Sequence, residues 1–279
     1  MEERTIVSFD YAIKYLLRDK ANFGILSGFL SELLQRKVAV QAILESESNK
    51  DGPDGKTNRV DLKAQIDDSE VAVFEIQFRE TVDFFSKVLF GIGKTIVEQA
   101  SAGSKLYDIK KVYSINISYY NFEAKHEYLF NCKVDGFRGV HFPEELIRFE
   151  QACDIANVSS AKVDIHPEYY LILPEMFDEQ QRGGFNEWMY VLKKSAVRSD
   201  SMANGIEEAS LKLDLLKMSP SERRAYEEYL ANRSSVYSAI YTAEQKIKAE
   251  VAKNLKLDGM PVEKIAKMTG LSADEINNL

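Results

Sequence analysis

The sequence contains little cysteine and little histidine, which limits the kinds of metal site it can form. It has two cysteines and three histidines among 279 residues. Cys132 and Cys153 do not have the spacing of a zinc site, and two thiols in a cytoplasmic chain are expected to be free. His126, His141 and His166 form no ligand cluster in the sequence. A zinc site is therefore not expected.

Long apolar runs and an excess of positive charge are also missing. No run reaches the roughly 18 apolar residues that a membrane helix needs. The first ten residues, MEERTIVSFD, lack an apolar signal region, which predicts a cytoplasmic protein. The chain carries 36 Lys and Arg against 44 Asp and Glu, a net charge of −8. That balance counts against a protein that coats nucleic acid non-specifically, although local charge at a cleft matters more than the total.

A phosphate-binding loop of the Walker type is absent as well. The segment GIGKT at 91–95 resembles the end of such a loop, but the motif needs a glycine where Val88 stands. The segment also falls inside a helical pattern rather than after a strand. A phosphotransferase built on this motif is therefore excluded.

What the sequence does contain is a strong β-hairpin pattern at 58–78, NRVDLKAQIDDSEVAVFEIQF. The first run alternates apolar and polar side chains with a period of two, as in a half-buried strand. The residues at 67–69 are turn formers. The second run places Glu75 and Gln77 on one face and only apolar residues on the other. The polar positions of the first run are Asp61, Lys63 and Gln65.

The turn predicts the register of this hairpin. A three-residue loop pairs residue 66 with 70 and therefore Asp61 with Glu75. Cross-strand neighbours lie about 4.5–5.5 Å apart at Cβ, and two carboxylates that close repel each other unless a cation lies between them. Mg²⁺ is held by one or two carboxylates together with phosphate oxygens and water. The register therefore predicts a small divalent-metal site, with Gln77 next along the same face.

A solvated strand face is the alternative interpretation of the same two carboxylates. The second strand favours a partner or a metal, because AVFEIQF is apolar on both sides of Glu75, which is typical of an interior strand. A buried charge without a partner is costly.

Asp61 followed by Glu75-Ile76-Gln77 resembles the D…(E)xK core of the PD-(D/E)XK nucleases. It is most similar to the branch of recombination-promoting nucleases and transposases, the Rpn family, in which glutamine replaces the usual lysine. Further segments resemble that family in order, so the resemblance covers nearly the whole chain. They are SFDYAIKYLL at 8–17, GFLSELL at 28–34, ILESESN at 43–49, KVYSINISYY at 111–120 and IAKMTGLSADEI at 265–276.

The resemblance implies a metal-dependent DNA endonuclease that hydrolyses phosphodiester bonds. Asp61, Glu75 and the backbone carbonyl of Ile76 would hold Mg²⁺ (or Mn²⁺), and Gln77 would hydrogen-bond the attacking water without supplying charge. DNA is the implied partner, RNA remains open, and a homodimer would suit two cuts in a duplex. The alternative is a catalytically weak or inactive nuclease fold that serves as a nucleic-acid or protein interaction module, which the acidic charge and Gln77 favour.

Four further residues are secondary candidates, each with a structural alternative. Asp10 lies in the first turn of a helix, where a carboxylate also favours the helix dipole. Glu32 lies off the apolar stripe of the next helix; in many nucleases of this superfamily a glutamate there joins the metal site, and the alternative is a surface glutamate. Lys87 and Lys94 share one face of a long helix, where they either reach a phosphate or are solvated.

We expect an α/β fold, with a mixed central β-sheet flanked by helices and a helical C-terminal region. The resemblance implies a restriction-endonuclease-like core of this kind. The expected domains are a nuclease-like α/β domain at 1–180, a helical extension at 181–257 and a small helix-turn-helix-like tail at 258–279. The expected elements include helices at 9–20, 22–35, 80–103, 205–217, 221–232 and 236–257, strands at 38–48 and 108–120, further strands near 126–134, 144–150 and 169–173, and a loop at 49–57.

The tail is predicted to form a helix, a turn and a second helix. Pro261 suits a helix start, Gly270 a helix end, and Ser272 an N-cap. A helix that reads DNA needs basic or amide side chains at its start. The last helix opens with Asp274 and Glu275, which would repel phosphates. Packing or self-association is therefore favoured over DNA reading.

Overall fold

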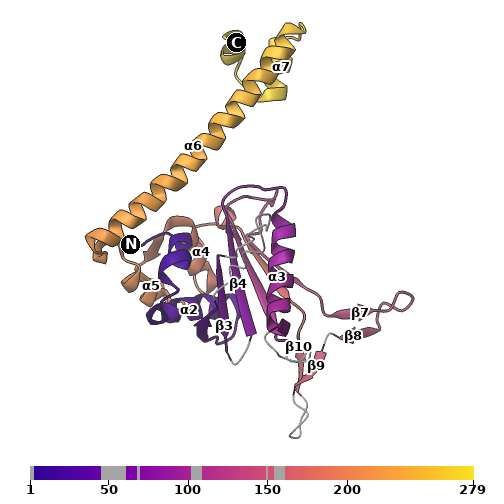
Figure 1. Ribbon diagram of the computed structural model, residues 1–279, viewed down its shortest axis with the longest axis vertical. Coiled ribbons are helices and arrows are strands. Elements are labelled where there is room, and N and C mark those ends of the chain that lie inside the picture. Colours follow the sequence, from indigo (N-terminus) through magenta and orange to yellow (C-terminus); the bar gives the residue numbers. More distant parts are fainter. Residues whose placement is uncertain (1–2, 45–60, 68–69, 102–108, 149, 154–160) are drawn as a thin grey trace. The chain divides into compact units, whose positions relative to one another are not determined.

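The computed structural model describes residues 3–44, 61–67, 70–101, 109–148, 150–153 and 161–279. The chain forms two compact units, Met1–Lys217 and Met218–Leu279 (Figure 1). Among the described residues, none of the helices has the length and apolar character needed to cross a membrane. The loop expected at 49–57, Val60 and the turn residues Asp68 and Ser69 lie outside the described residues.

A six-stranded sheet in the order β2-β3-β4-β5-β11-β6 forms the centre of the first unit. The strands β2, β3 and β4 are antiparallel, β4, β5 and β11 are parallel, and β6 is an antiparallel edge. The sheet is therefore mixed, and the predicted α/β class is confirmed. The strand bounds are β2 Val40–Ile43, β3 Leu62–Ile66, β4 Glu70–Gln77, β5 Val112–Ser118, β11 Glu168–Ile172 and β6 Leu129–Lys133.

The hairpin β3–β4 has the predicted register. Ile66 lies opposite Glu70, and Leu62 lies opposite Phe74 at the other end of the pairing. The chain bends at Asp61, one residue before β3, and the Asp61 backbone N–H donates to the carbonyl oxygen of Phe74 at 3.1 Å. Asp61 therefore makes the last backbone hydrogen bond of this end of the hairpin, although it lies just outside the strand.

Helices cover both faces of this sheet. Figure 1 shows α3 (Phe84–Ser101) on one side and α2 (Phe23–Leu34), α4 (Phe185–Lys194) and α5 (Ile206–Lys212) on the other. Helices α4 and α5 lie beyond the boundary expected at residue 180, yet both pack within the first unit. The main core lies on their side, where the ring of Phe29 contacts those of Phe74 and Trp188 at centroid distances of 6.0 and 5.4 Å.

The face under α3 is more polar but equally covered. A small apolar cluster of Val71, Val73, Ile92 and Val112 joins the helix to the sheet. Lys63, expected on a half-solvated face, is buried and forms an ion pair with Glu98 of α3. The expectation of an exposed polar face on β3 is therefore wrong, because α3 lies over it.

The N-terminal segment is less regular than the helix expected at 9–20. It forms α1 (Phe9–Tyr11), a π-helical turn at Ala12–Leu16 and a 3₁₀ turn at Lys20–Asn22. A π turn widens the helix and is common at functional sites. Four short strands form two antiparallel pairs, with bounds β7 Gly136–Arg138, β8 Leu146–Arg148, β9 Glu150–Cys153 and β10 Ala161–Asp164. The strand β8 lies in the range predicted near 144–150.

Two more strands join the N-terminus to the helices. The strand β1 (Glu3–Thr5) pairs antiparallel with β12 (Ala196–Arg198), which follows α4. Single 3₁₀ turns occur at Pro174–Met176 and Leu215–Lys217.

The second unit consists of three helices. The sequence predicted separate helices at 221–232 and 236–257, but the structure has one continuous α6 (Pro220–Leu257). Ser234 and Ser235 lie inside it, and serine lowers helix stability by only a few tenths of a kcal/mol. The predicted tail is confirmed as α7 (Val262–Thr269), a left-handed Gly270 and α8 (Ala273–Asn277) with a Ser272 capping box. Its core contains Ala252, Ile265, Leu271 and Ile276.

Candidate active site

The candidate site lies at the carboxyl end of the parallel strands. Glu75 and Gln77 end β4, and the bend at Asp61 lies beside them across the hairpin. Open α/β sheets bind their ligands outside the carboxyl ends of their parallel strands. The two carboxylates predicted to form the site therefore occupy the end of the sheet where a ligand is expected.

Main-chain groups hold Asp61 in place. Its Oδ2 accepts a hydrogen bond from the backbone N–H of Ile76 at 2.8 Å, which continues the hairpin ladder with a side chain. Its Oδ1 lies 3.4 Å from Nζ of Lys14, and Arg18 donates to its backbone carbonyl at 2.6 Å. The Asp61 side chain is 17% exposed. A fixed, largely buried carboxylate of this kind is already oriented for a ligand.

Burial and mutual repulsion disturb the pKa of both carboxyl groups. Burial raises the pKa of Glu75 to about 7, with a further contribution from the charge of Asp61, while Lys87 and Lys14 oppose the rise. Burial also raises the pKa of Asp61, against the attraction of Lys14 and the Ile76 hydrogen bond. The two carboxyl groups are therefore held close together, and ionisation of both is unfavourable. A proton or a bound cation would remove the repulsion between them.

Asp10 approaches the same pair from the N-terminal segment. It is buried in α1, and its charge contributes to the raised pKa of Asp61. Its secondary candidacy therefore has an electrostatic basis in the structure, in addition to its place in the first turn of the helix.

Of the two lysines that the sequence singled out, Lys87 acts on the carboxylate pair and Lys94 pairs with Glu98. Lys87 forms an ion pair with Asp83 at 3.0 Å and lowers the pKa of Glu75. Lys94 lies two turns further along α3, and its Nζ is 3.9 Å from Glu98.

Lys14, which the sequence analysis did not select, is the lysine in contact with Asp61. The signal that could have found Lys14 is its spacing of four from Asp10, because residues four apart share a helix face.

Gln77 and Ile76 complete the end of β4. The Gln77 amide nitrogen donates to the carbonyl oxygen of Arg79 at 2.7 Å and to Oγ1 of Thr81 at 3.4 Å. The N–H of Ile76 is directed at Asp61. In an extended strand the N–H and C=O of one residue point to the same side, so the Ile76 carbonyl faces the β3 side as well.

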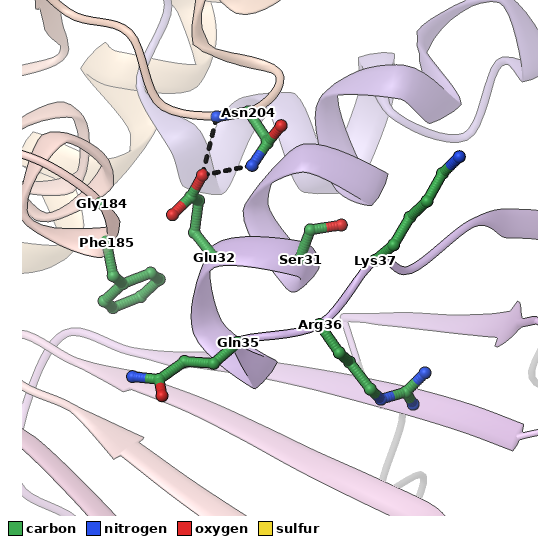
Figure 2. Close-up of a pocket in the computed structure, with 8 residues that line it drawn as sticks. All are labelled: Ser31, Glu32, Gln35, Arg36, Lys37, Gly184, Phe185 and Asn204. Carbon is green, nitrogen blue, oxygen red and sulfur yellow. Dashed lines mark hydrogen bonds between the residues drawn. The ribbon is translucent and has the colours of Figure 1, made fainter.

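Glu32 is not brought to this pair. Its carboxylate accepts hydrogen bonds from the backbone N–H and the side-chain amide of Asn204, at 2.9 and 2.5 Å, as Figure 2 shows. Arg36, one turn further, forms ion pairs with Asp67 and Glu70 at the turn end of the hairpin. Glu32 therefore lies toward the opposite end of the sheet, where it fixes the loop before α5.

The donor set of the pair fits a hard divalent cation. Within the described parts of the chain, no group of three or more His, Cys, Asp and Glu side chains is close enough to hold a metal ion. Two carboxylates and a backbone carbonyl are hard oxygen ligands, and Mg²⁺ keeps several waters or phosphate oxygens when it binds. The pair is therefore compatible with an ion whose shell is completed by water and substrate, and not with a closed protein cage.

A mixed sheet with helices on both faces and two acidic residues at the end of its central hairpin defines a restriction-endonuclease-like core. Residues 7–136 match the model of a family described as PD-(D/E)XK nuclease family transposase. The matched segment contains Asp10, Lys14, Asp61 and Glu75. Comparisons with curated proteins and with solved structures gave no match.

Proposed function

We propose that the protein is a Mg²⁺- or Mn²⁺-dependent DNA endonuclease of the recombination-promoting, transposase-like kind, which hydrolyses phosphodiester bonds. The observation that carries the proposal is the pair of half-buried carboxyl groups, Asp61 and Glu75, with a pKa of about 7 at Glu75, inside the segment matched by the nuclease family. Perturbed carboxyl groups at the ligand-binding end of a sheet favour a functional site over a solvated strand face.

Asp61, Glu75 and the carbonyl of Ile76 are the proposed ligands of the ion. When bound, Mg²⁺ or Mn²⁺ supplies a more acidic water and neutralises charge on the phosphate. Asp61 needs no rearrangement for this role, because the Ile76 N–H holds one of its oxygens. Glu75 releases its proton to the solvent as the pH rises through about 7, and its charge then becomes available.

Lys14 and Lys87 are the proposed source of the positive charge that Gln77 does not provide. Gln77 stands where the superfamily usually has lysine, and an amide can orient a water or a phosphate oxygen but carries no charge. Both lysines lower the pKa of Glu75, and Lys14 contacts Asp61. A phosphate that enters the site would therefore meet cationic side chains from two elements, the π turn and α3.

The test is cleavage of supercoiled plasmid with Mg²⁺ or Mn²⁺ by the full chain. We expect nicking that EDTA abolishes and that Asp61→Ala and Glu75→Ala each remove. Glu207→Ala, which deletes an exposed carboxylate of α5, should leave nicking unchanged. Equal nicking by wild type and both site variants would place the activity elsewhere or in a contaminant. An RNA of the same sequence in a parallel reaction tests the choice of DNA.

An inactive nuclease fold that binds nucleic acid or protein is the second candidate. The glutamine at position 77 favours it, as does the net charge of −8. Calorimetric titration with Mn²⁺ separates the two functions without a substrate. An endonuclease should bind Mn²⁺, and its Asp61→Ala variant should not. An interaction module with a vestigial site should bind no Mn²⁺ even as wild type.

A further inference from the structure

A cleft of about 380 Å³ lies between α3 and the outer strands of the sheet. Its walls are apolar and largely aromatic, with Phe85, Val88 and Leu89 from α3 and Phe130, Tyr169 and Leu171 from β6 and β11. Its size falls in the range of about 300–1,000 Å³ that is usual for small-ligand pockets. No charged side chain lines it, so its ligand should be a neutral, flat or apolar group rather than a phosphate.

The cleft adjoins the proposed metal site. Asn116, which lines the cleft, lies directly opposite Glu75 in the pairing of β4 with β5. Neighbouring strands are about 4.8 Å apart. On the helix side, Val88 of the cleft follows Lys87, whose charge acts on Glu75. A strand whose phosphate lies at the carboxylates would therefore have its nearest bases within reach of the cleft.

Amide groups give this apolar cleft a polar edge. Asn116 is buried, and its Nδ2 donates to the carbonyl oxygens of Ser114 and Tyr170 at 3.2 and 3.1 Å and to Oγ of Ser114 at 2.9 Å. These bonds fix the amide and leave its oxygen Oδ1 as the atom that can accept from a ligand. Asn131, at the rim, is held through its own Nδ2 by Glu168 at 3.0 Å.

We propose that this cleft binds an unpaired nucleobase of the strand whose phosphate enters the Asp61–Glu75 site; the inference rests on the proposed function. Enzymes that hold an extruded or single-stranded base stack it between aromatic or apolar side chains and read its edge by hydrogen bonds. The cleft offers both elements, stacking walls and an amide acceptor. Unpaired or distorted DNA is then the preferred substrate.

Cys132 provides a reporter inside the cleft. Its thiol is free and exposed, and it lines the cleft beside Asn131. The experiment measures the alkylation rate of Cys132 in the full chain by peptide mass spectrometry, with EDTA present so that no strand is cut. A short single-stranded oligodeoxynucleotide should slow alkylation in a saturable manner. The same length of abasic strand, or a fully paired duplex, should slow it much less.

A matched pair of phenylalanine variants separates the cleft from the rest of the surface. Phe85, in the cleft wall, is 66% exposed, and Phe137 of β7, outside it, is 67% exposed. Base stacking on an aromatic ring contributes enough that its loss weakens binding by about 5- to 150-fold. Phe85→Ala should therefore raise the oligonucleotide concentration needed for protection by that factor, and Phe137→Ala should not change it.

Several outcomes would overturn the proposal. Equal protection by abasic strands would mean that the backbone, and not the base, is bound. Protection that grows with protein concentration in the absence of oligonucleotide would mean that a second copy covers the cleft. Nicking of plasmid without any protection of Cys132 would contradict the base site and support the proposed function. Protection without any nicking would support the base site and contradict the proposed function.

Discussion

The pKa values of the carboxyl groups are shifted in opposite directions at the two ends of the central sheet. At the amino end of the parallel strands, Lys111 lies 2.8 Å from Asp164 and 2.9 Å from Glu168. Burial alone would raise the pKa of both carboxyl groups, but the hydrogen bonds from Lys111 bring both below their usual values. At the carboxyl end, the pKa of Asp61 and of Glu75 is raised.

The difference separates charges that are paired within the fold from charges that we propose bind a ligand. At the amino end each of these carboxylates has a cation within hydrogen-bonding distance, so the charges stabilise one another. At the carboxyl end, two carboxylates share the attraction of Lys14 and Lys87, and Lys14 makes an ion pair with Asp61. Such an excess of negative charge lowers stability and raises affinity for cations. This contrast supports the proposal that the carboxyl end holds the functional site and that the charges at the amino end are structural.

Removal of Lys111 should have the largest effect on stability. Its side chain is 6% exposed, and Lys111→Met leaves the two carboxylates without their buried partner. Breaking a buried ion pair by removing one partner costs about 3–5 kcal/mol. Urea unfolding should show a loss of that size.

Lys133 provides the matched control for Lys111. It approaches the same carboxylates, at 3.5 and 3.9 Å, but is 47% exposed. An exposed ion pair contributes at most about 1 kcal/mol. If Lys133→Met and Lys111→Met cost the same, burial is not what distinguishes the amino end.

The pH dependence of stability should have opposite signs at the two ends. Glu75 has a pKa of about 7 in the folded protein, against 4.5 for an ordinary glutamate. The folded state therefore binds its proton more tightly, and stability is full below about pH 4.5 and falls as the pH rises through 7. The loss is on the order of 3 kcal/mol in metal-free protein. Glu75→Gln should flatten this part of the curve.

Glu168 should behave in the opposite sense. Its pKa is lowered in the folded protein, so its contribution is present above the ordinary glutamate value of 4.5 and is lost as the pH falls. Glu168→Gln should therefore reduce stability at neutral pH and weaken its decline in acid. Unfolding curves between pH 2 and 8, measured with EDTA, compare the two variants. A wild-type curve that rises through pH 7 would contradict the assignment at Glu75.

The hairpin was predictable in detail because its signals are local. Turn formers fixed the pairing of Ile66 with Glu70, and the apolar flanks of Glu75 indicated an interior strand. The burial of Lys63 was not predictable, because alternation shows that a strand has two faces but not whether a helix covers the second one. Which lysine meets Asp61 depends on how the N-terminal segment packs, and spacing within one helix does not contain that information.

Candidate residues on helices illustrate the same limit. Asp10 and Glu32 both lie on predicted helices, and the sequence made each of them a secondary candidate. The close approach of α2 to the loop before α5 separates them: a Cβ at Gly28 would lie 2.3 Å from the carbonyl oxygen of Asn204. This contact brings Asn204 to Glu32 and keeps Glu32 at the structural end. Long-range packing, and not local pattern, thus decides which acidic residue lies near the Asp61–Glu75 pair.

The three lysines near the carboxyl end should differ in their effect on the pH–rate profile of cleavage. Lys14 opposes the raised pKa of both carboxyl groups, and Lys87 opposes that of Glu75. Lys14→Met should therefore shift the acid limb of the profile to higher pH by up to about one unit. Lys87→Met should shift it in the same direction, because Lys87 opposes the raised pKa of Glu75 more strongly than Lys14 does. Lys94→Met, which removes a partner of Glu98, should not shift it.

Lys14→Arg is the control for these variants, because it keeps the charge near Asp61. It should preserve the position of the acid limb even if the rate changes. A shift as large in Lys94→Met as in Lys14→Met would mean that general surface charge, and not contact with the carboxylate pair, sets the profile.

The smallest effect is expected at Gln77. Its amide makes neutral hydrogen bonds to Arg79 and Thr81, and such bonds contribute about 0.5–1.5 kcal/mol each. Gln77→Ala should therefore lower the cleavage rate by no more than about tenfold. Gln77→Lys adds a charge beside Glu75 and should move the acid limb to lower pH. If Gln77→Ala instead abolished cleavage as Glu75→Ala does, the amide would be an essential part of the carboxyl end, and the lysines would not compensate for the missing charge.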